Sequence, residues 1–136
     1  MEQYGYFEHD ADIGIIGRGT TPEAAFESAA EAMFAIMAEG VAGPWEAEVA
    51  FEFEEDDLEF ALVRWLNGLI ARAQSDGVVL GKFGLKREGS RWVAKAWGTP
   101  WKRETVRGVE VKGATLTMLS VKEENGVWEA RCIVDV

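Results

Sequence analysis

The sequence predicts a single α+β domain, residues 1–136, with two amphipathic helices packed on one face of a largely antiparallel β-sheet. Two stretches carry apolar residues at three- and four-residue spacing, which is typical of helices with one buried face. Several shorter stretches alternate apolar and polar residues between turn signals, which is typical of half-buried strands. The predicted order is two strands, a helix, a strand, a second helix and four strands, as in α+β proteins.

The first half of the chain contains the start of this pattern. Residues 4–8 and 13–18 are predicted strands. Thr21-Pro22-Glu23 predicts a helix start, because a hydroxyl caps the first turn, proline suits the first position and an acid favours the amino end. This helix is expected to run to about Glu39, and Gly40 ends it.

A third strand at 49–53 and the second helix follow. Asp56 and Asp57 can cap this helix, whose apolar side chains recur on one side until Ser75. Asn125-Gly126 is the strongest local signal for a β-hairpin. The four remaining strands are predicted at 79–87, 91–97, 109–121 and 127–134.

The chain is strongly acidic. It has 24 Asp and Glu residues against 14 Lys and Arg residues, which gives a formal net charge of −10. Because nucleic-acid affinity comes mainly from Lys and Arg contacts to phosphates, direct binding of RNA or DNA is not expected. A basic protein surface or a divalent cation is the more suitable direct partner.

The sequence favours a cytoplasmic protein without a membrane contact. Its first residues lack the basic region and apolar block of a leader segment, and no apolar run approaches the ~20 residues of a membrane span. The single cysteine, Cys132, has no partner for an internal disulfide, which suits a reducing compartment.

Four ionisable side chains lie close together near the amino end: Glu8, His9, Asp10 and Asp12. Three interpretations are open: the solvated end of a strand, the oxygen ligands of a cation, or a general acid and base. One His and one Cys far apart in the chain do not supply a zinc site. The sequence has no phosphate-binding loop and no nucleophile elbow, so hard oxygen chemistry remains.

A cation site needs ligands from more than one segment. In an extended strand, Asp10 and Asp12 would point to the same side. The chain end offers two further anions, the Asp135 side chain and the α-carboxylate of Val136. If the last strand lies beside the first, these carboxylates converge, and such a cluster is tolerable chiefly when Ca²⁺ or Mg²⁺ neutralises it, with Mn²⁺ as a further option.

Five segments together resemble one known family, in order and over essentially the whole chain. They are residues 7–14 (FEHDADIG), 21–26 (TPEAAF), 94–98 (AKAWG) with Pro100, 110–115 (EVKGAT) and the closing Asp135-Val136. Each segment alone is a weak signal. In register, they resemble the archease family.

The resemblance implies a function and a site. Archeases are small acidic proteins that assist the RtcB-type RNA-splicing ligase, which joins tRNA exon halves with GTP and Mn²⁺. They promote guanylylation of the ligase, support its multiple turnover and broaden its nucleotide use, and they are not themselves enzymes. The family also implies a Ca²⁺ site, whose ligands in this chain would be Asp12, Asp135 and Val136.

This chain departs from the family pattern at two places. Asp10 stands where family members commonly have Thr, so it is an added acid and a candidate for an extra ligand, a supporting group or an exposed charge. Leu116-Thr117 stands where many members carry a Tyr-His pair. His9, between two acids, has three interpretations: a hydrogen-bonding strut, a contact to the ligase, or a direct ligand of the cation.

Three further residues are candidate partner contacts. Residues 97–103 place Trp97 and Trp101 beside two cations, Lys102 and Arg103, around a Gly-Pro turn. Because Trp and Arg are favoured anchors of protein interfaces, this segment is a candidate contact loop, with local packing as the alternative. Lys112 is expected to be solvated or to pair with the acidic cluster.

Three functions from different classes follow from these features. The first is an activator of an RtcB-type ligase. The second is a metal-dependent hydrolase with Asp10 or Asp12 as its base, although no Lys or Arg motif that grips phosphate lies near the cluster. The third is a chaperone-like or scaffold protein in which the cation is only structural. Mixing the protein with a ligase and GTP separates these functions.

Overall fold

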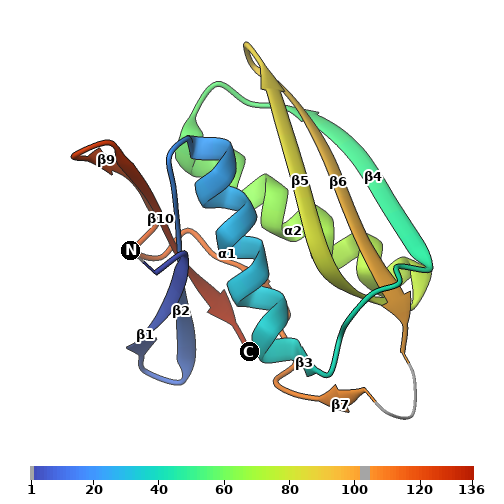
Figure 1. The fold of residues 1–136 in the computed structure, drawn as a ribbon. Coiled ribbons are helices and arrows are strands. Elements are labelled where there is room, and N and C mark those ends of the chain that lie inside the picture. Colours follow the sequence, from blue (N-terminus) through green and yellow to red (C-terminus); the bar gives the residue numbers. More distant parts are fainter. Residues whose placement is uncertain (1, 102–104) are drawn as a thin grey trace.

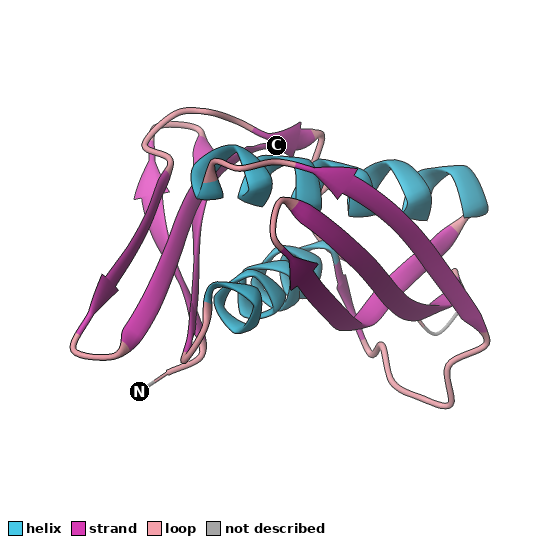
Figure 2. Ribbon diagram, turned by 90° about the horizontal axis from the view of Figure 1, so that it is seen from above, coloured by secondary structure: helices cyan, strands magenta, loops and turns pink. Residues whose placement is uncertain are grey.

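Two β-sheets enclose a layer of two helices (Figures 1 and 2). The structure is a computed structural model, and it describes residues 2–101 and 105–136. The helices are α1 (Pro22–Met37) and α2 (Leu58–Asp76). The strands are β1 (Tyr4–His9), β2 (Asp12–Gly19), β3 (Ala38–Glu39), β4 (Ala47–Glu54), β5 (Val78–Glu88), β6 (Arg91–Pro100), β7 (Val106–Arg107), β8 (Gly113–Ala114), β9 (Ser120–Glu124) and β10 (Val127–Asp135).

The strand pairs are antiparallel, and they belong to separate sheets. One sheet has the order β1-β2-β10-β8 with β9 also paired to β10, another has the order β4-β6-β5, and β3 pairs with β7. The α+β class with two helices and antiparallel pairing is therefore confirmed. The strands do not form the one sheet that the sequence suggested, because α1 packs against both β2 and β5 and is covered from two sides (Figure 2).

Both helix starts follow the local sequence. The Thr21 hydroxyl accepts a hydrogen bond from the Ala24 N–H at 3.1 Å, and Pro22 begins α1. Asp57 caps α2 in the same way, with its Oδ1 accepting from the Phe60 N–H at 3.0 Å. These caps satisfy amide groups that the first turn of a helix leaves without partners.

The core lies between the helices and both large sheets, with Ile15 of β2 and Cys132 of β10 as members on one side and Trp92 of β6 on the other. Trp65 of α2 is fully buried, and its indole N–H donates to the Phe26 carbonyl at 2.8 Å. The Phe26 ring stacks on Trp92 of β6, with the ring centres 5.4 Å apart. These contacts tie α1, α2 and β6 together. The Trp92 indole N–H donates to the Glu55 carbonyl at 3.0 Å, so both buried indoles have a hydrogen-bond partner.

The predicted strand at 109–121 is wrong. Strand β10 pairs Val134 with Ala114 but pairs Arg131 with Ser120. Three residues therefore separate the two positions on β10, whereas six separate them on the partner side. The surplus is accommodated by a loop over residues 115–119, so the segment forms β8 and β9 instead of one strand.

The predicted loop after residue 97 also differs from the structure. Strand β6 continues to Pro100, which pairs with Val78 at the end of β5. Gly98 allows this continuation, because a Cβ atom at that position would collide with the main chain of Val79. Trp97 therefore lies on a strand.

Candidate functional site

The acidic segment near the amino end forms the hairpin between β1 and β2. His9 and Asp12 are paired across this hairpin, and Asp10 and Ala11 make the turn. Asp10 is exposed and has a φ of 51°, a conformation that Asp tolerates better than most residues. The expectation that Asp10 and Asp12 follow each other along one extended strand is therefore wrong.

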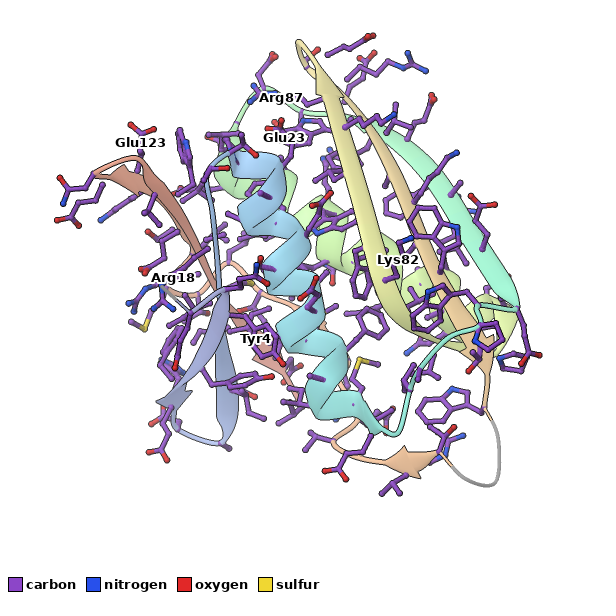
Figure 3. The ribbon with its side chains drawn as sticks, in the orientation of Figure 1. Tyr4, Arg18, Glu23, Lys82, Arg87 and Glu123 are labelled. Atoms are coloured by element: carbon purple, nitrogen blue, oxygen red, sulfur yellow. The ribbon has the colours of Figure 1, made fainter. Side chains whose placement is uncertain are left out.

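Asp12 points away from the helices. On β2, Gly17 faces α1, because a Cβ atom there would collide with Ala25 and Ala29. Arg18, the next residue, points to the opposite, outer side in Figure 3 and pairs there with Glu129. Side chains alternate along a strand, so Asp12 lies on the same outer face as Arg18.

The last strand brings Asp135 to the same place. Strand β10 lies directly beside β2 and pairs Val134 with Ile13, so the next pair in this register is Asp135 with Asp12. Directly opposed residues share a face, with Cβ atoms roughly 4.5–5.5 Å apart. His9, Asp12 and Asp135 thus form a row across three strands on the outer face, which we call the acidic row.

The main chain of Val136, at the end of the chain, also lies next to Asp12. Its main-chain N–H donates to Asp12 Oδ1 at 3.5 Å, a long hydrogen bond between residues 124 positions apart. Val136 is half-buried. The three residues expected to ligate a cation, Asp12, Asp135 and Val136, are therefore neighbours.

Charge favours a cation at this row. Among residues 2–101 and 105–136, no Lys or Arg forms an ion pair with Asp12 or Asp135. Arg131, on the same face of β10, is bound to Glu129 at 2.7 Å, and this contact holds the pKa of the Glu129 carboxyl below its usual value. Like charges directly opposite each other are destabilising, and a divalent cation with oxygen ligands removes this repulsion.

The donor set of the row fits a hard cation only with the chain end included. Within the described part of the chain, no three His, Cys, Asp or Glu side chains are grouped to hold a metal ion. Asp12 and Asp135 supply two carboxylates, and Val136 would supply the third as a main-chain carboxylate. Three anionic oxygen donors suit Ca²⁺ or Mg²⁺ better than softer metals.

His9 contributes an unsatisfied nitrogen to the row. Its Nδ1 atom is shielded from solvent and has no hydrogen-bond partner among the described residues. A buried polar atom without a partner costs free energy unless something else satisfies it. The atom therefore suits a ligand, or a group held by a ligand, beside Asp12.

The side of the row next to β8 is supported by Asn67, which sequence reasoning missed. Its Oδ1 accepts from the Ala114 N–H at 2.8 Å, and its Nδ2 donates to the Ala114 carbonyl at 3.3 Å. Ala114 pairs with Val134, and Gly113 pairs with Asp135. The sequence signal was only a polar residue beside the apolar stripe of α2, which alone does not indicate a partner.

Of the candidate partner contacts, Lys112 lies next to the row, whereas Trp97 and Trp101 contact cations elsewhere in the chain. Trp97 is half-buried on β6, with Lys82 Nζ 5.1 Å from its ring centre. Trp101 is half-buried, with the Arg107 guanidinium 3.9 Å from its ring centre. Lys112 is exposed, and its N–H donates to the Asp135 carbonyl at 2.8 Å. Lys102 and Arg103 lie outside the described residues.

Comparison with known proteins identifies the family. The model of the "Archease protein family (MTH1598/TM1083)" matches residues 4–136. The chain belongs to the archease family. It is 35% identical to "Protein archease" of Sulfolobus acidocaldarius, with all of both chains covered, and 33% identical to that of Pyrococcus furiosus, again over both whole chains.

Two solved structures share the archease fold. The solution structure of Methanobacterium thermoautotrophicum protein 1598 superposes with a TM-score of 0.87 at 29% identity, covering all of both chains. The crystal structure of an archease from Thermotoga maritima, described as a possible chaperone, has a TM-score of 0.69 at 23% identity and covers 96% of this chain and 94% of that one. None of the described helices is long and apolar enough to cross a membrane.

Proposed function

We propose that this protein activates an RtcB-type RNA-splicing ligase in tRNA splicing. We also propose that Asp12, Asp135 and the terminal carboxylate of Val136 hold a divalent cation. Ca²⁺ is the preferred ion, with Mg²⁺ or Mn²⁺ as alternatives. The observation that carries the proposal is membership of the archease family over residues 4–136. The protein acts on the ligase as an accessory factor in the cytoplasm, and it performs no covalent chemistry of its own.

The acidic row supports the cation part of this proposal. Two opposed carboxylates, neither ion-paired with a Lys or Arg of the described residues, and a chain end hydrogen-bonded to one of them make a compact set of oxygen donors. A bound cation supplies positive charge that offsets their repulsion. It also links the hairpin of β1 and β2 to the end of β10, which gives a partner a fixed surface. Asp10 and His9 are the candidates for a further ligand or a supporting group.

The charge of the chain supports contact with a protein instead of RNA. A net charge of −10 opposes phosphate and suits the basic surface that a ligase needs for its own RNA substrate. In this arrangement the ligase binds the RNA. The archease contacts the ligase and speeds the formation of its covalent GMP intermediate.

The direct test is a guanylylation assay. A purified RtcB-type ligase is incubated with labelled GTP and Mn²⁺, with and without this protein, and formation of ligase-GMP is followed over time. We expect faster guanylylation with the protein present. Asp12→Asn and Asp135→Asn should lose most of this effect, because each leaves the cation with one fewer carboxylate.

Glu8→Gln is the matched control. Glu8 is an exposed acid on the same hairpin, but it pairs with Ile13 and therefore lies on the other face of the sheet from Asp12. This variant removes the same charge and should activate the ligase fully. An unmodified protein that leaves the rate of guanylylation unchanged would refute the ligase proposal.

A chaperone-like role is the second candidate, because the Thermotoga maritima relative is described as a possible chaperone. In that case the protein should keep the ligase in solution on heating without changing the guanylylation rate of folded ligase. A hydrolase would instead turn over GTP or RNA without any ligase, so the same assay without ligase tests this third function.

A further inference from the structure

Two apolar side chains stand out from the surface in the loop between β8 and β9. Leu116 is 62% exposed and Met118 is 59% exposed, the highest values among the large apolar side chains of the described residues. The neighbouring Leu119 packs against the hydrophobic core, so an apolar contact attaches the loop to the body of the protein. Exposed apolar side chains that lie together and are rimmed by polar residues are typical of interaction surfaces.

The loop is held firmly at its base. The Thr115 N–H and hydroxyl both donate to the Ile133 carbonyl, at 3.0 and 2.9 Å, and the Cys132 thiol donates to the Thr115 carbonyl at 3.4 Å. The Thr117 N–H donates to the Thr115 hydroxyl at 3.3 Å. This network holds the main chain on both sides of Leu116. A partner would therefore meet the exposed Leu116 side chain on an ordered backbone.

The backbone at Met118 is also unfavourable for its residue type. Met118 has a φ of 52°, in the left-handed region where glycine is favoured and an unbranched side chain is strained by about 1 kcal/mol or more. The side chain is mostly exposed, so little burial within this chain offsets the cost. Residues held in such conformations cluster at active sites, ligand clamps and switch regions.

The loop lies next to the acidic row. It begins one residue after Ala114, which pairs with Val134, and Gly113 pairs with Asp135. The surplus of three residues on this side of β10 produces the loop at that point, where β10 changes its partner from β9 to β8. The base of the loop at Thr115 therefore lies close in the sheet to Asp135, the β10 end of the acidic row.

We propose that Leu116 and Met118 form an apolar anchor that inserts into an apolar cleft of the protein partner, a cleft whose rim is basic where it meets Asp12 and Asp135. The inference rests on the proposed function, and it specifies the surface of that partner. Charge complementarity favours a basic protein partner over a second copy of this chain. A second copy of this chain would bring two surfaces of a molecule with net charge −10 together, which like-charge repulsion opposes.

The test measures affinity and stability separately. Binding of an RtcB-type ligase to the unmodified protein, Leu116→Asn and Met118→Gly is followed by calorimetric titration, and each free protein is melted. We expect both variants to bind roughly tenfold or more weakly, because each loses a buried apolar anchor. Met118→Gly should nevertheless melt at the same or a higher temperature, because glycine adopts this φ without strain.

Val106→Thr is the matched control, since Val106 is 57% exposed and the replacement keeps its shape. It should bind as tightly as the unmodified protein. Unchanged affinity of both loop variants, with the unmodified protein binding normally, would overturn the anchor alone, whereas failure of the unmodified protein to bind would overturn the ligase proposal and the anchor together. Self-association that Leu116→Asn abolishes would assign the loop to a second copy and overturn the anchor.

Discussion

The side chain of Asn67 forms two hydrogen bonds with the main chain of Ala114, accepting from its N–H at 2.8 Å and donating to its carbonyl at 3.3 Å. This pair joins α2 to β8, the short strand beside the end of β10. The Asn67 side chain thereby binds the two main-chain groups of Ala114 that a further strand would otherwise bind. Because β8 pairs with β10 at Asp135, this contact helps to hold the main chain beside that residue of the acidic row.

Asn67→Ala should destabilise the protein and the cation site together. The substitution leaves the Ala114 N–H and carbonyl without partners in a partly buried place, which costs roughly 1–3 kcal/mol. Urea unfolding should report this loss, and Ca²⁺ titration should report weaker binding than in the unmodified protein. Gln74→Ala, an exposed position on the same helix, is the control and should change neither. Unchanged Ca²⁺ affinity of Asn67→Ala would disconnect β8 from the site.

The chain end should tolerate a changed side chain but not an added residue. Val136→Ile keeps the terminal carboxylate, so it should bind Ca²⁺ like the unmodified protein. One added glycine converts that carboxylate into a neutral carbonyl and moves the charge about 3.5 Å outward. We expect affinity to fall about tenfold, the equivalent of ~1.4 kcal/mol, in a calorimetric titration. Equal affinities would remove the terminal carboxylate from the proposed site.

Gly17→Ala should prevent normal folding. A Cβ atom at Gly17 would collide with the main chain of Ala25 and Ala29, and backbone atoms cannot move aside as a flexible side chain can. We expect a loss of several kcal/mol, comparable to the worst cases of overpacking. Gly5→Ala on the adjacent strand is the control, because its Cβ would meet only the end of Arg18 at 3.9 Å. Circular dichroism and thermal melting of the two variants compare them directly.

Tyr6 should make the fold sensitive to alkali. Its hydroxyl donates to the Ala32 carbonyl at 2.8 Å, and burial of this end, with a smaller contribution from Tyr4, raises the pKa of Tyr6 from 10.0 to about 12. The stabilisation is complete below pH 10 and is lost as the pH rises through about 12, because the folded state disfavours the ionised phenol. The urea midpoint should therefore fall across this range, and Tyr6→Phe should flatten the fall. An equally steep fall in Tyr6→Phe would assign it to other groups.

Cys132 should react slowly with thiol reagents in the folded protein. The residue is fully buried, and burial raises the pKa of its thiol to about 11. Since the thiolate is the reactive form, little of it is present at neutral pH. Modification by a chromogenic disulfide should be slow in buffer and fast in urea. Fast modification of the folded protein would place the thiol near the surface.

The sequence alone determined the features that depend on neighbouring residues. Thr21 and Asp57 cap their helices as predicted, because an N-cap needs only an oxygen and an amide three residues on. The hairpin at Asn125-Gly126 joins β9 and β10, with both residues at positive φ, which this pair adopts most readily. The family motifs likewise predicted membership of the archease family, which the match over residues 4–136 confirms.

The tertiary structure decided what depends on register between distant strands. The pattern of residues 109–121 suited a strand, but no local signal states that β10 pairs Ala114 and Ser120 with a surplus of three residues between them. The division of the strands into separate sheets likewise depends on which elements cover the two sides of α1. The acidic row forms for the same reason: Asp12 and Asp135 become neighbours only because β10 lies beside β2, since strand pairing is fixed by burial of a shared face and not by short-range sequence.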